Sequence, residues 1–342
     1  MAELRAVLCG DPHVKDKDHP DVTILEEDCA RVIDEWHPDI FVCMGDLCDA
    51  HDKVKMISHK RGVQFMQQMS RRVPSVLLLG NHDRPPHQKF DFEDHYFTGV
   101  ERPGVLDIVD RPRFYTHRKG AFTWNLGCIP YLPTGTLHST LQTMGLDFSQ
   151  VHASFGHQEI HGCDRHASTN YKPSLSVKGD RWPQDWGPLF SGHIHKRQTL
   201  GNVYYVGTPR QETFEEDTNK GICRLILRLP EGATYGVPEI DYVPTRIPPK
   251  LTFNLTPEEF YNFQAPENCK SRVIVKGKTS EVRVLEQMPQ FKALSQKCQV
   301  LTEGISEQKV SGPTVAGKPD YWEYVNSKLN PDQQQMLASI PK

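Results

Sequence analysis

Four apolar segments of this 342-residue sequence each run directly into a short group of polar side chains. The groups are Asp11-Pro-His13, Gly45-Asp46, Gly80-Asn-His-Asp83 and Gly192-His-Ile-His195. A short apolar run that stops at such a group is typical of a buried strand whose carboxyl end carries functional side chains. Because the carboxyl ends of parallel strands meet at one edge of a sheet, the repeated pattern predicts an α/β fold with a shared site at that edge.

The amino-terminal part of the chain alternates between strand and helix patterns. Apolar runs predict strands at Leu4–Cys9, Ile40–Met44 and Val76–Leu79. Between them, Asp21–Trp36 and Val54–Arg72 have apolar residues at helical spacing. Strand, helix, strand, helix, strand in this order predicts parallel strands with helices packed on the sheet.

The next part of the chain is richer in strand patterns. Apolar runs predict strands at Arg113–Thr116, Phe122–Ile129, Val151–Phe155, Leu189–Ser191, Val203–Val206 and Ile222–Leu227, and a helix at Thr136–Met144. This order predicts a four-layer α/β/β/α sandwich, in which two mixed sheets face each other and helices lie outside.

A proline-rich stretch, with Pro244, Pro248 and Pro249, predicts a domain boundary. We expect a catalytic domain at 1–245 and a small accessory α+β unit at 250–300, with a strand at Ser271–Lys276 and a helix at Val284–Cys298. Residues 301–320 are rich in Ser, Gly, Lys and Glu and predict a flexible linker. Residues 321–342 form a helical pattern that closes the chain.

Composition restricts the environment of the protein more than its chemistry. The formal charge of -3 gives no overall attraction to nucleic acid, so any such binding depends on local basic patches. The nine cysteines are odd in number and contain no Cys-x-x-Cys pair, which favours a reducing compartment. No secretory signal and no apolar run near the ~20 residues of a membrane span occur, so we expect a cytoplasmic protein, or one in the host nucleus if it is viral in a eukaryote.

The spacing of the polar groups favours metal coordination. Residues two apart at a strand end point to the same face, so Asp11 with His13, and His193 with His195, present paired ligands to one place. Carboxylate, imidazole and amide oxygen suit Mn, Fe or Zn better than Ca, and the absence of thiolates argues against a structural zinc site.

One further histidine would complete the ligand set. His157 follows the apolar residues Phe155-Gly156 at the end of a predicted strand, where a ligand is expected. His152, inside that strand, and His161, after the next turn, are the alternatives. Their positions make His157 the preferred ligand.

In this order, the motifs resemble those of the calcineurin-like metallophosphoesterase superfamily, over roughly residues 4 to 228. The resemblance implies phosphoester hydrolysis at two divalent metal ions, Mn first, with Fe, Zn or Mg as alternatives. It assigns Asp11, His13 and His195 to the first ion, Asn81, His157 and His193 to the second, and Asp46 to both.

The resemblance also implies a mechanism. Two cations about 3.5 to 4 Å apart lower the pKa of a shared water and hold the phosphate oxygens, so that hydroxide attacks phosphorus in line. In the resemblance, His82 occupies the position that protonates the leaving oxygen or steadies the transition state, and Asp83 is expected to orient its ring.

Within the superfamily, the sequence is most similar to the SbcD-type DNA exonucleases of repair and recombination. The resemblance extends to phage and viral members of that group. Protein phosphatases follow Gly-Asp with Val-Asp-Arg-Gly, whereas this chain has Gly45-Asp-Leu-Cys-Asp49 and no such arginine. The strand end Gly207-Thr-Pro209 is similar to the one that follows the last metal motif in SbcD-like and phage recombination nucleases. We therefore expect a nuclease that hydrolyses DNA phosphodiesters, as an exonuclease or endonuclease.

Further contacts and partners follow from this reading. The expected substrate contacts are Asp49, His51, Arg84 and Arg210, and the basic residues expected to touch DNA phosphates, or else to form a solvated face, are Lys270, Arg272, Lys276, Lys278 and Arg283. The acidic run Glu212–Asp217 reads as a solvated loop. The helical segment at 321–342 is expected to bind an SbcC-type ATPase. We also expect the protein to form a homodimer and to have no membrane partner. The alternatives are a phosphatase acting on phosphoprotein or small nucleotides, and a non-catalytic scaffold.

Overall fold

The computed structural model describes residues 2–17, 19–49, 55–85, 90–165 and 174–305. The chain divides into two compact units, Met1–Phe253 with Ala265–Arg272, and Asn254–Gln264 with Val273–Lys342. The described part of the second unit ends at Ile305.

The first sheet contains the three strands predicted near the amino terminus. Its order is β12-β11-β1-β2-β3-β4, formed by β12 (Val237–Val243), β11 (Ile222–Leu229), β1 (Ala2–Cys9), β2 (Ile40–Cys43), β3 (Ser75–Leu78) and β4 (Leu106–Val109). Strands β1 to β4 are parallel, whereas β11 is antiparallel to both β1 and β12. The sheet is therefore mixed.

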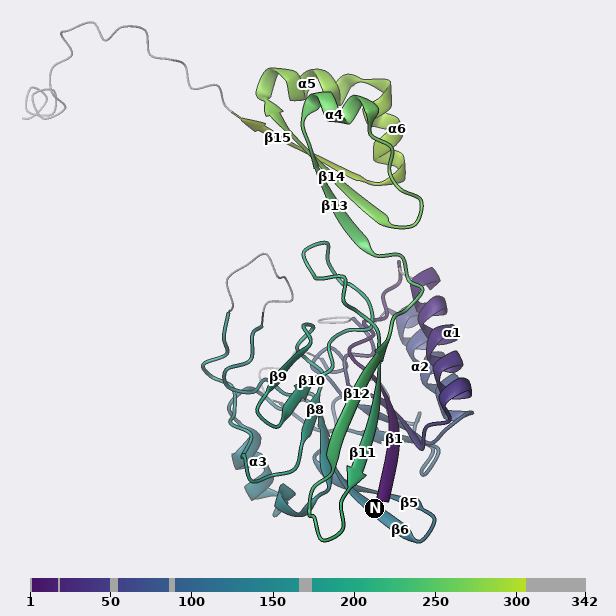
Figure 1. The fold of residues 1–342 in the computed structure, drawn as a ribbon, viewed down its shortest axis with the longest axis vertical. Helices are drawn as coiled ribbons and strands as arrows, with labels where there is room; N and C mark the ends of the chain where they lie inside the picture. The colour runs from purple at the N-terminus through teal and green to yellow at the C-terminus, as the bar shows by residue number, and fades with distance from the viewer. Residues whose placement is uncertain (1, 18, 50–54, 86–89, 166–173, 306–342) are drawn as a thin grey trace, which may run out of the picture. The chain divides into compact units, whose positions relative to one another are not determined.

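Helices α1 (His19–Trp36) and α2 (Met56–Ser70) cover the outer face of this sheet, and both lie on one side of the unit in Figure 1. The helical spacing in the sequence is the cause, because it places Val22, Leu25 and Cys29 on one buried face of α1. Helix α1 ends where His37, which precedes Pro38, takes a left-handed φ of 50°.

The second sheet is also mixed. Its order is β5-β6-β7-β8-β10-β9, formed by β5 (Arg113–Lys119), β6 (Phe122–Ile129), β7 (Ala153–Gly156), β8 (Leu189–Ser191), β10 (Val203–Tyr205) and β9 (Gln198–Leu200). Helix α3 (Leu137–Thr143) and a short 3-10 helix (Phe148–Gln150) pack on its outer side through Leu137, Leu141 and Phe148.

The two sheets face each other across one hydrophobic core. Leu4, Leu8 and Val42 of the first sheet contact the same buried cluster as Trp124 and Phe190 of the second. With α1 and α2 outside one sheet and α3 outside the other, this confirms the predicted α/β/β/α sandwich.

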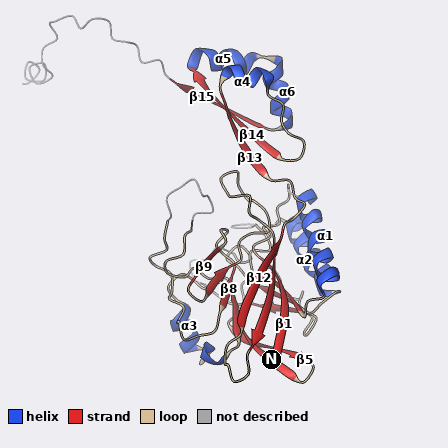
Figure 2. Ribbon diagram, viewed as in Figure 1, coloured by secondary structure: helices blue, strands red, loops and turns tan. Residues whose placement is uncertain are grey.

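A third, small sheet follows the proline-rich stretch. Its order is β13-β14-β15, formed by β13 (Lys250–Leu255), β14 (Lys270–Lys278) and β15 (Gln299–Ile305). Helices α4 (Pro257–Asn262), α5 (Thr279–Gln287) and α6 (Pro289–Lys297) gather on one side of these strands (Figure 2). Val273 and Val275 of β14 are buried together with Val282 and Leu285 of α5.

Two features of this small unit differ from the prediction. The expected single helix at Val284–Cys298 is two helices, because Pro289 has no backbone N–H and begins a new helix. Residues 301–305, expected in the linker, belong to β15, and the helical segment expected at 321–342 lies outside the described residues.

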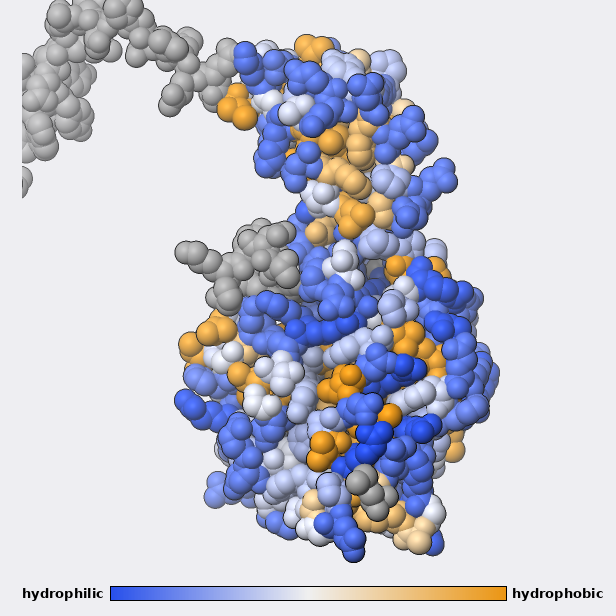
Figure 3. Space-filling model, viewed as in Figure 1, coloured by the Kyte–Doolittle hydropathy of each residue, from blue (hydrophilic) through white to orange (hydrophobic). Residues whose placement is uncertain are grey.

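The surface is dominated by polar side chains. On the face drawn in Figure 3, hydrophobic residues form small separate patches within a hydrophilic surface. In the described ranges, none of the helices has the length and apolar character needed to cross a membrane.

Candidate metal centre

The predicted ligands come together where five strands end. Asp11 and His13 follow β1, Asp46 follows β2, Asn81 and His82 follow β3, His157 follows β7, and His193 and His195 follow β8. Three of these strands belong to the first sheet and two to the second. The site therefore lies at the carboxyl ends of strands from both sheets, as the sequence predicted.

The backbone at this site is strained. Four non-glycine residues in the described ranges have a positive φ, and three of them are His13 (45°), Asp46 (49°) and His193 (74°). Such conformations are costly for residues with a side chain and tend to be kept where function requires them. The strain marks these strand ends as a functional site.

Two glycines allow the strand ends to approach closely. A Cβ atom on Gly80 would lie 2.0 Å from Oδ1 of Asp46. Gly45 has a φ of 106°, and a Cβ there would lie 2.3 Å from Nδ1 of His157. Both distances are far inside van der Waals contact, so the glycines of the Gly-Asp and Gly-Asn motifs are required by packing.

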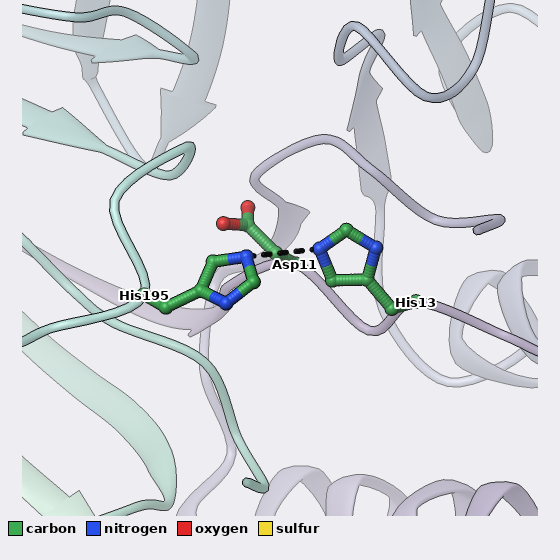
Figure 4. Close-up of side chains that lie close together, drawn as sticks. All are labelled: Asp11, His13 and His195. Atoms are coloured by element: carbon green, nitrogen blue, oxygen red, sulfur yellow. Dashed lines mark hydrogen bonds between the residues drawn. The ribbon is translucent and has the colours of Figure 1, made fainter. Parts of the chain in front are cut away.

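Asp11, His13 and His195 form the first half of the site (Figure 4). The Nε2 atoms of the two histidines are 3.1 Å apart. Nδ1 of His195 is 3.2 Å from the Glu216 carboxylate, and Nδ1 of His13 is 3.5 Å from the Asp49 carboxylate. When Nδ1 of His195 donates to Glu216, the lone pair of its ring is on Nε2, which faces Nε2 of His13 and the Asp11 carboxylate, so the three residues present ligand atoms to one point.

Asn81, His157 and His193 form the second half. Oδ1 of Asn81 lies 3.2 Å from Nε2 of His157 and 3.0 Å from Nδ1 of His193. Nδ1 of His157 is 2.7 Å from the Met44 carbonyl, to which it donates, so Nε2 is left to face the site. Burial, with the charge of His157, lowers the pKa of His193 to about 3 and keeps its ring neutral, the form that binds a metal.

Asp46 lies between the two halves. Its Oδ2 is 3.9 Å from Nε2 of His13 and 3.3 Å from Nε2 of His157, while its Oδ1 accepts the backbone N–H of His82. Burial alone would lower the pKa of His157, but Asp46 and Asp11 outweigh burial and raise it to about 9. The electrostatic field of the Asp46 and Asp11 carboxylates therefore favours a positive charge between the two ligand groups.

These residues fit a pair of divalent cations. Oδ2 of Asp11 is buried and has no hydrogen-bond partner among the residues that the structure describes. Carboxylate oxygens, imidazole nitrogens and an amide oxygen converge without a thiolate, which is a donor set for Mn, Fe or Zn.

His82 stands beside this cluster with a carboxylate partner of its own. Its Nδ1 lies 3.2 Å from Oδ1 of Asp49, and its side chain is 14% exposed. Burial lowers the pKa of His82, but the adjacent Asp49 carboxylate, with Asp46 and Asp83, outweighs burial and raises the pKa. Asp49, His13 and His82 are also close enough to hold an ion, but Nζ of Lys15 lies 3.3 Å from the other Asp49 oxygen, which argues against a cation there.

The fold and the ligand geometry agree with a comparison to known families. A family model described as "Calcineurin-like phosphoesterase" matches residues 4–227. The chain belongs to this family. The matched range contains every strand end that contributes to the cluster. Membership supports hydrolysis of phosphoesters and implies divalent metal ions.

Two viral proteins are similar to this calcineurin-like phosphoesterase along most of its length. "Putative phosphoesterase 078R" of Invertebrate iridescent virus 3 is 27% identical over 355 residues, which cover 99% of this chain and 96% of that protein. "Putative phosphoesterase 244L" of Invertebrate iridescent virus 6 is 26% identical over 292 residues, which cover 84% of this chain and 98% of that protein. Among solved structures, one described as "GAP50 the anchor in the inner membrane complex of Plasmodium" has a TM-score of 0.40 and 11% identity, over 66% of this chain and 82% of that one. A likeness at this level says nothing about function.

Asp83 does not orient His82 as predicted. Its carboxylate accepts the backbone N–H groups of Leu47, Cys48 and Gly80, and it is fully buried. Burial, with the charge of Asp46, raises its pKa to about 6. Asp83 therefore braces the loops after β2 and β3, and the partner of the His82 ring is Asp49.

The two arginines expected to contact substrate are structural instead. Arg84 is 4% exposed, and its guanidinium donates to the carbonyls of Asp91, Phe92 and Asp110. Arg210 is 2% exposed and donates to the carbonyl of His13. Of the other two predicted contacts, His51 lies outside the described residues, and Asp49 lies beside the rings of His13 and His82.

The acidic run Glu212–Asp217 is not a solvated loop throughout. The side chains of Glu212 and Glu216 are 6% and 2% exposed. Glu212 pairs with Lys15, and Glu216 with His195. No sequence pattern pointed to these contacts, because they form between segments that are distant along the chain.

His157 is the histidine that reaches the cluster. His152 instead accepts the backbone N–H of Asn125 and lies against Trp124. His161 is in the turn after β7, where its backbone N–H bonds to the carbonyl of Asp180. The strand-end position of His157 was therefore the informative signal.

Proposed function

We propose that the chain is a metal-dependent phosphodiesterase that cleaves DNA, a nuclease of SbcD type, using two divalent cations with Mn as the preferred pair. One observation carries the phosphodiesterase proposal: the Asp46 carboxylate faces both ligand groups, and His82 lies next to it with a carboxylate on its far ring nitrogen. A cation pair next to a proton donor is what hydrolysis of a diester needs.

The residues divide between the two cations by their positions. Asp11, His13 and His195 would hold one, and Asn81, His157 and His193 the other, with Asp46 shared. When bound, such a pair activates water as a nucleophile and neutralises phosphate oxygens.

His82 supplies the proton for the leaving group. In a diester the leaving oxygen departs as an alkoxide, so the breaking P–O bond needs a proton at that oxygen. Nδ1 of His82 faces Asp49, which leaves Nε2, 4.0 Å from Oδ2 of Asp46, as the donor. After the bond breaks, the neutral ring regains its proton from water.

Three features support DNA as the substrate. The Gly45-Asp-Leu-Cys-Asp49 segment lacks the arginine of protein phosphatases, and β10 runs into the nuclease-like Gly207-Thr-Pro209 end. The small unit after residue 250 is in keeping with the resemblance to SbcD-type nucleases, which append a DNA-capping domain. However, Lys270, Arg272 and Lys276, which we expected either to touch DNA phosphates or to form a solvated face, make ion pairs with Asp21, Glu215 and Glu303, so they do not add to the support for DNA.

Cleavage of labelled DNA tests the substrate. Purified protein with Mn²⁺ should degrade end-labelled linear duplex or single-stranded DNA faster than it dephosphorylates a phosphopeptide. The variant Asp46→Asn, which removes the charge shared by both ligand groups, is the control and should release no products. The opposite substrate ranking would favour a phosphatase. Binding of an SbcC-type ATPase and homodimerisation remain separate proposals, tested by co-purification and by the mass of the protein in solution.

A further inference from the structure

A buried carboxylate lies behind the ligand His195. Glu216 belongs to the loop between β10 and β11, and its side chain is 2% exposed. Its Oε1 is 3.2 Å from Nδ1 of His195, on the side of the ring away from the ligand group. None of the motifs that identify the metal ligands includes Glu216.

A lysine holds this carboxylate in place. Nζ of Lys220 lies 2.8 Å from Oε2 of Glu216 and also donates to the backbone carbonyl of His195 at 3.0 Å. The backbone N–H of Glu212 donates to the same Oε2. The Lys220 side chain is only 6% exposed. Carboxylate, ammonium and histidine backbone thus form one buried unit whose geometry does not depend on solvent.

This arrangement controls the ring of His195. When Nδ1 donates its proton to Glu216, the lone pair is on Nε2, which faces His13 across 3.1 Å. A carboxylate on the far nitrogen fixes the tautomer and orientation of a ligand histidine and makes it more basic. We propose that Glu216 is a positioning residue that prepares His195 to bind the cation it shares with Asp11 and His13. The inference rests on the two-cation centre of the proposed function.

The acidic loop provides a matched control. Glu215 neighbours Glu216 and carries the same charge, but its carboxylate pairs with Arg272 instead of His195. Glu215→Gln therefore removes one charge from the same loop without touching the ligand group. Glu216→Gln keeps an oxygen that accepts from Nδ1, whereas Glu216→Ala removes the partner altogether.

Calorimetric titration of metal-free protein with Mn²⁺ tests the proposal. We expect Glu216→Ala to weaken one of the two binding steps by about 10- to 100-fold, the usual effect of removing such a partner. Glu216→Gln should weaken the same step less, because a neutral acceptor forms a weaker hydrogen bond than a charged one. Glu215→Gln should match the wild type.

The tautomer of His195 gives a readout that does not depend on metal or activity. In long-range proton-nitrogen NMR spectra of the metal-free wild type, we expect Nδ1 of neutral His195 to carry the proton, and Glu216→Ala to show a mixture of tautomers. Unchanged Mn²⁺ constants in Glu216→Ala, or in Glu216→Gln if the alanine variant does not fold, would overturn the proposal. A wild type that binds Mn²⁺ but does not cut DNA would count against the substrate and leave this inference standing.

Discussion

Replacing His82 with alanine separates proton donation from metal binding. A positioned general acid contributes about 10²- to 10⁴-fold to a rate, or ~3 to 5 kcal/mol. The structure indicates how much of this depends on Asp49. At 3.2 Å, an effective dielectric of about 20 gives an attraction of about 5 kcal/mol between Asp49 and the protonated ring. The two side chains are 28% and 14% exposed, so we halve that value for solvent screening. The remaining ~2.5 kcal/mol corresponds to a loss of about 70-fold in rate for Asp49→Asn.

The assay compares two leaving groups. A dinucleotide releases a sugar alkoxide, which needs the proton, whereas bis-p-nitrophenyl phosphate releases a phenolate that leaves without one. We expect His82→Ala to lower kcat by about 10²- to 10⁴-fold on the dinucleotide and far less on the nitrophenyl ester. The double variant with Asp49→Asn should be no slower than His82→Ala alone, because both changes act through one proton.

Two results would refute this reasoning. Equal losses on both substrates would mean that His82 supports the centre without donating a proton. Loss of bound Mn²⁺ in His82→Ala would mean that the group formed by His13, Asp49 and His82 holds a metal instead.

Three further predictions test the site and its surroundings. Gly80→Ala places a Cβ 2.0 Å from Oδ1 of Asp46, so it should weaken Mn²⁺ binding at least about 10-fold in a calorimetric titration. An affinity equal to that of the wild type would contradict the packing argument. Arg84→Ala removes a buried guanidinium that donates to three backbone carbonyls, so it should lower the free energy of unfolding by about 2 to 4 kcal/mol in urea, with KM unchanged. A raised KM at full stability would restore a role in substrate binding. Chelation should lower the Tm, since free Mn²⁺ at 100 times its Kd contributes about 2.7 kcal/mol, and an unchanged Tm would contradict a native metal centre.

The parts of the fold that sequence predicts are those with local causes. Strands β1, β2 and β3 are short apolar runs that end in polar groups, and helices α1 and α2 have apolar residues at helical spacing. The edge strand β12 has a weaker pattern and contains Pro238, which an edge tolerates, so it was not predicted. Proline also explains the break between α5 and α6.

The same distinction holds for the site. His157 and His193 were predicted because each lies within two residues of a strand end, where sequence position indicates which way a side chain points. Asp49 and Glu216 lie in irregular segments, and their partners His82 and His195 are far away in the chain. Contacts of this kind depend on how the two sheets meet, and no periodicity in the sequence encodes them. For this reason the ring partner of His82 was assigned to the adjacent Asp83.

Hydrolysis of bis-p-nitrophenyl phosphate tests the central claim most directly. We expect the wild-type protein with Mn²⁺ to turn over this diester, and Asp46→Asn to lose both the activity and the tight binding of metal, because Asp46 faces both ligand groups. A wild type that binds Mn²⁺ yet shows no hydrolysis with Mn²⁺, Fe²⁺, Zn²⁺ or Mg²⁺ would contradict the account and favour a scaffold that keeps the fold without the activity.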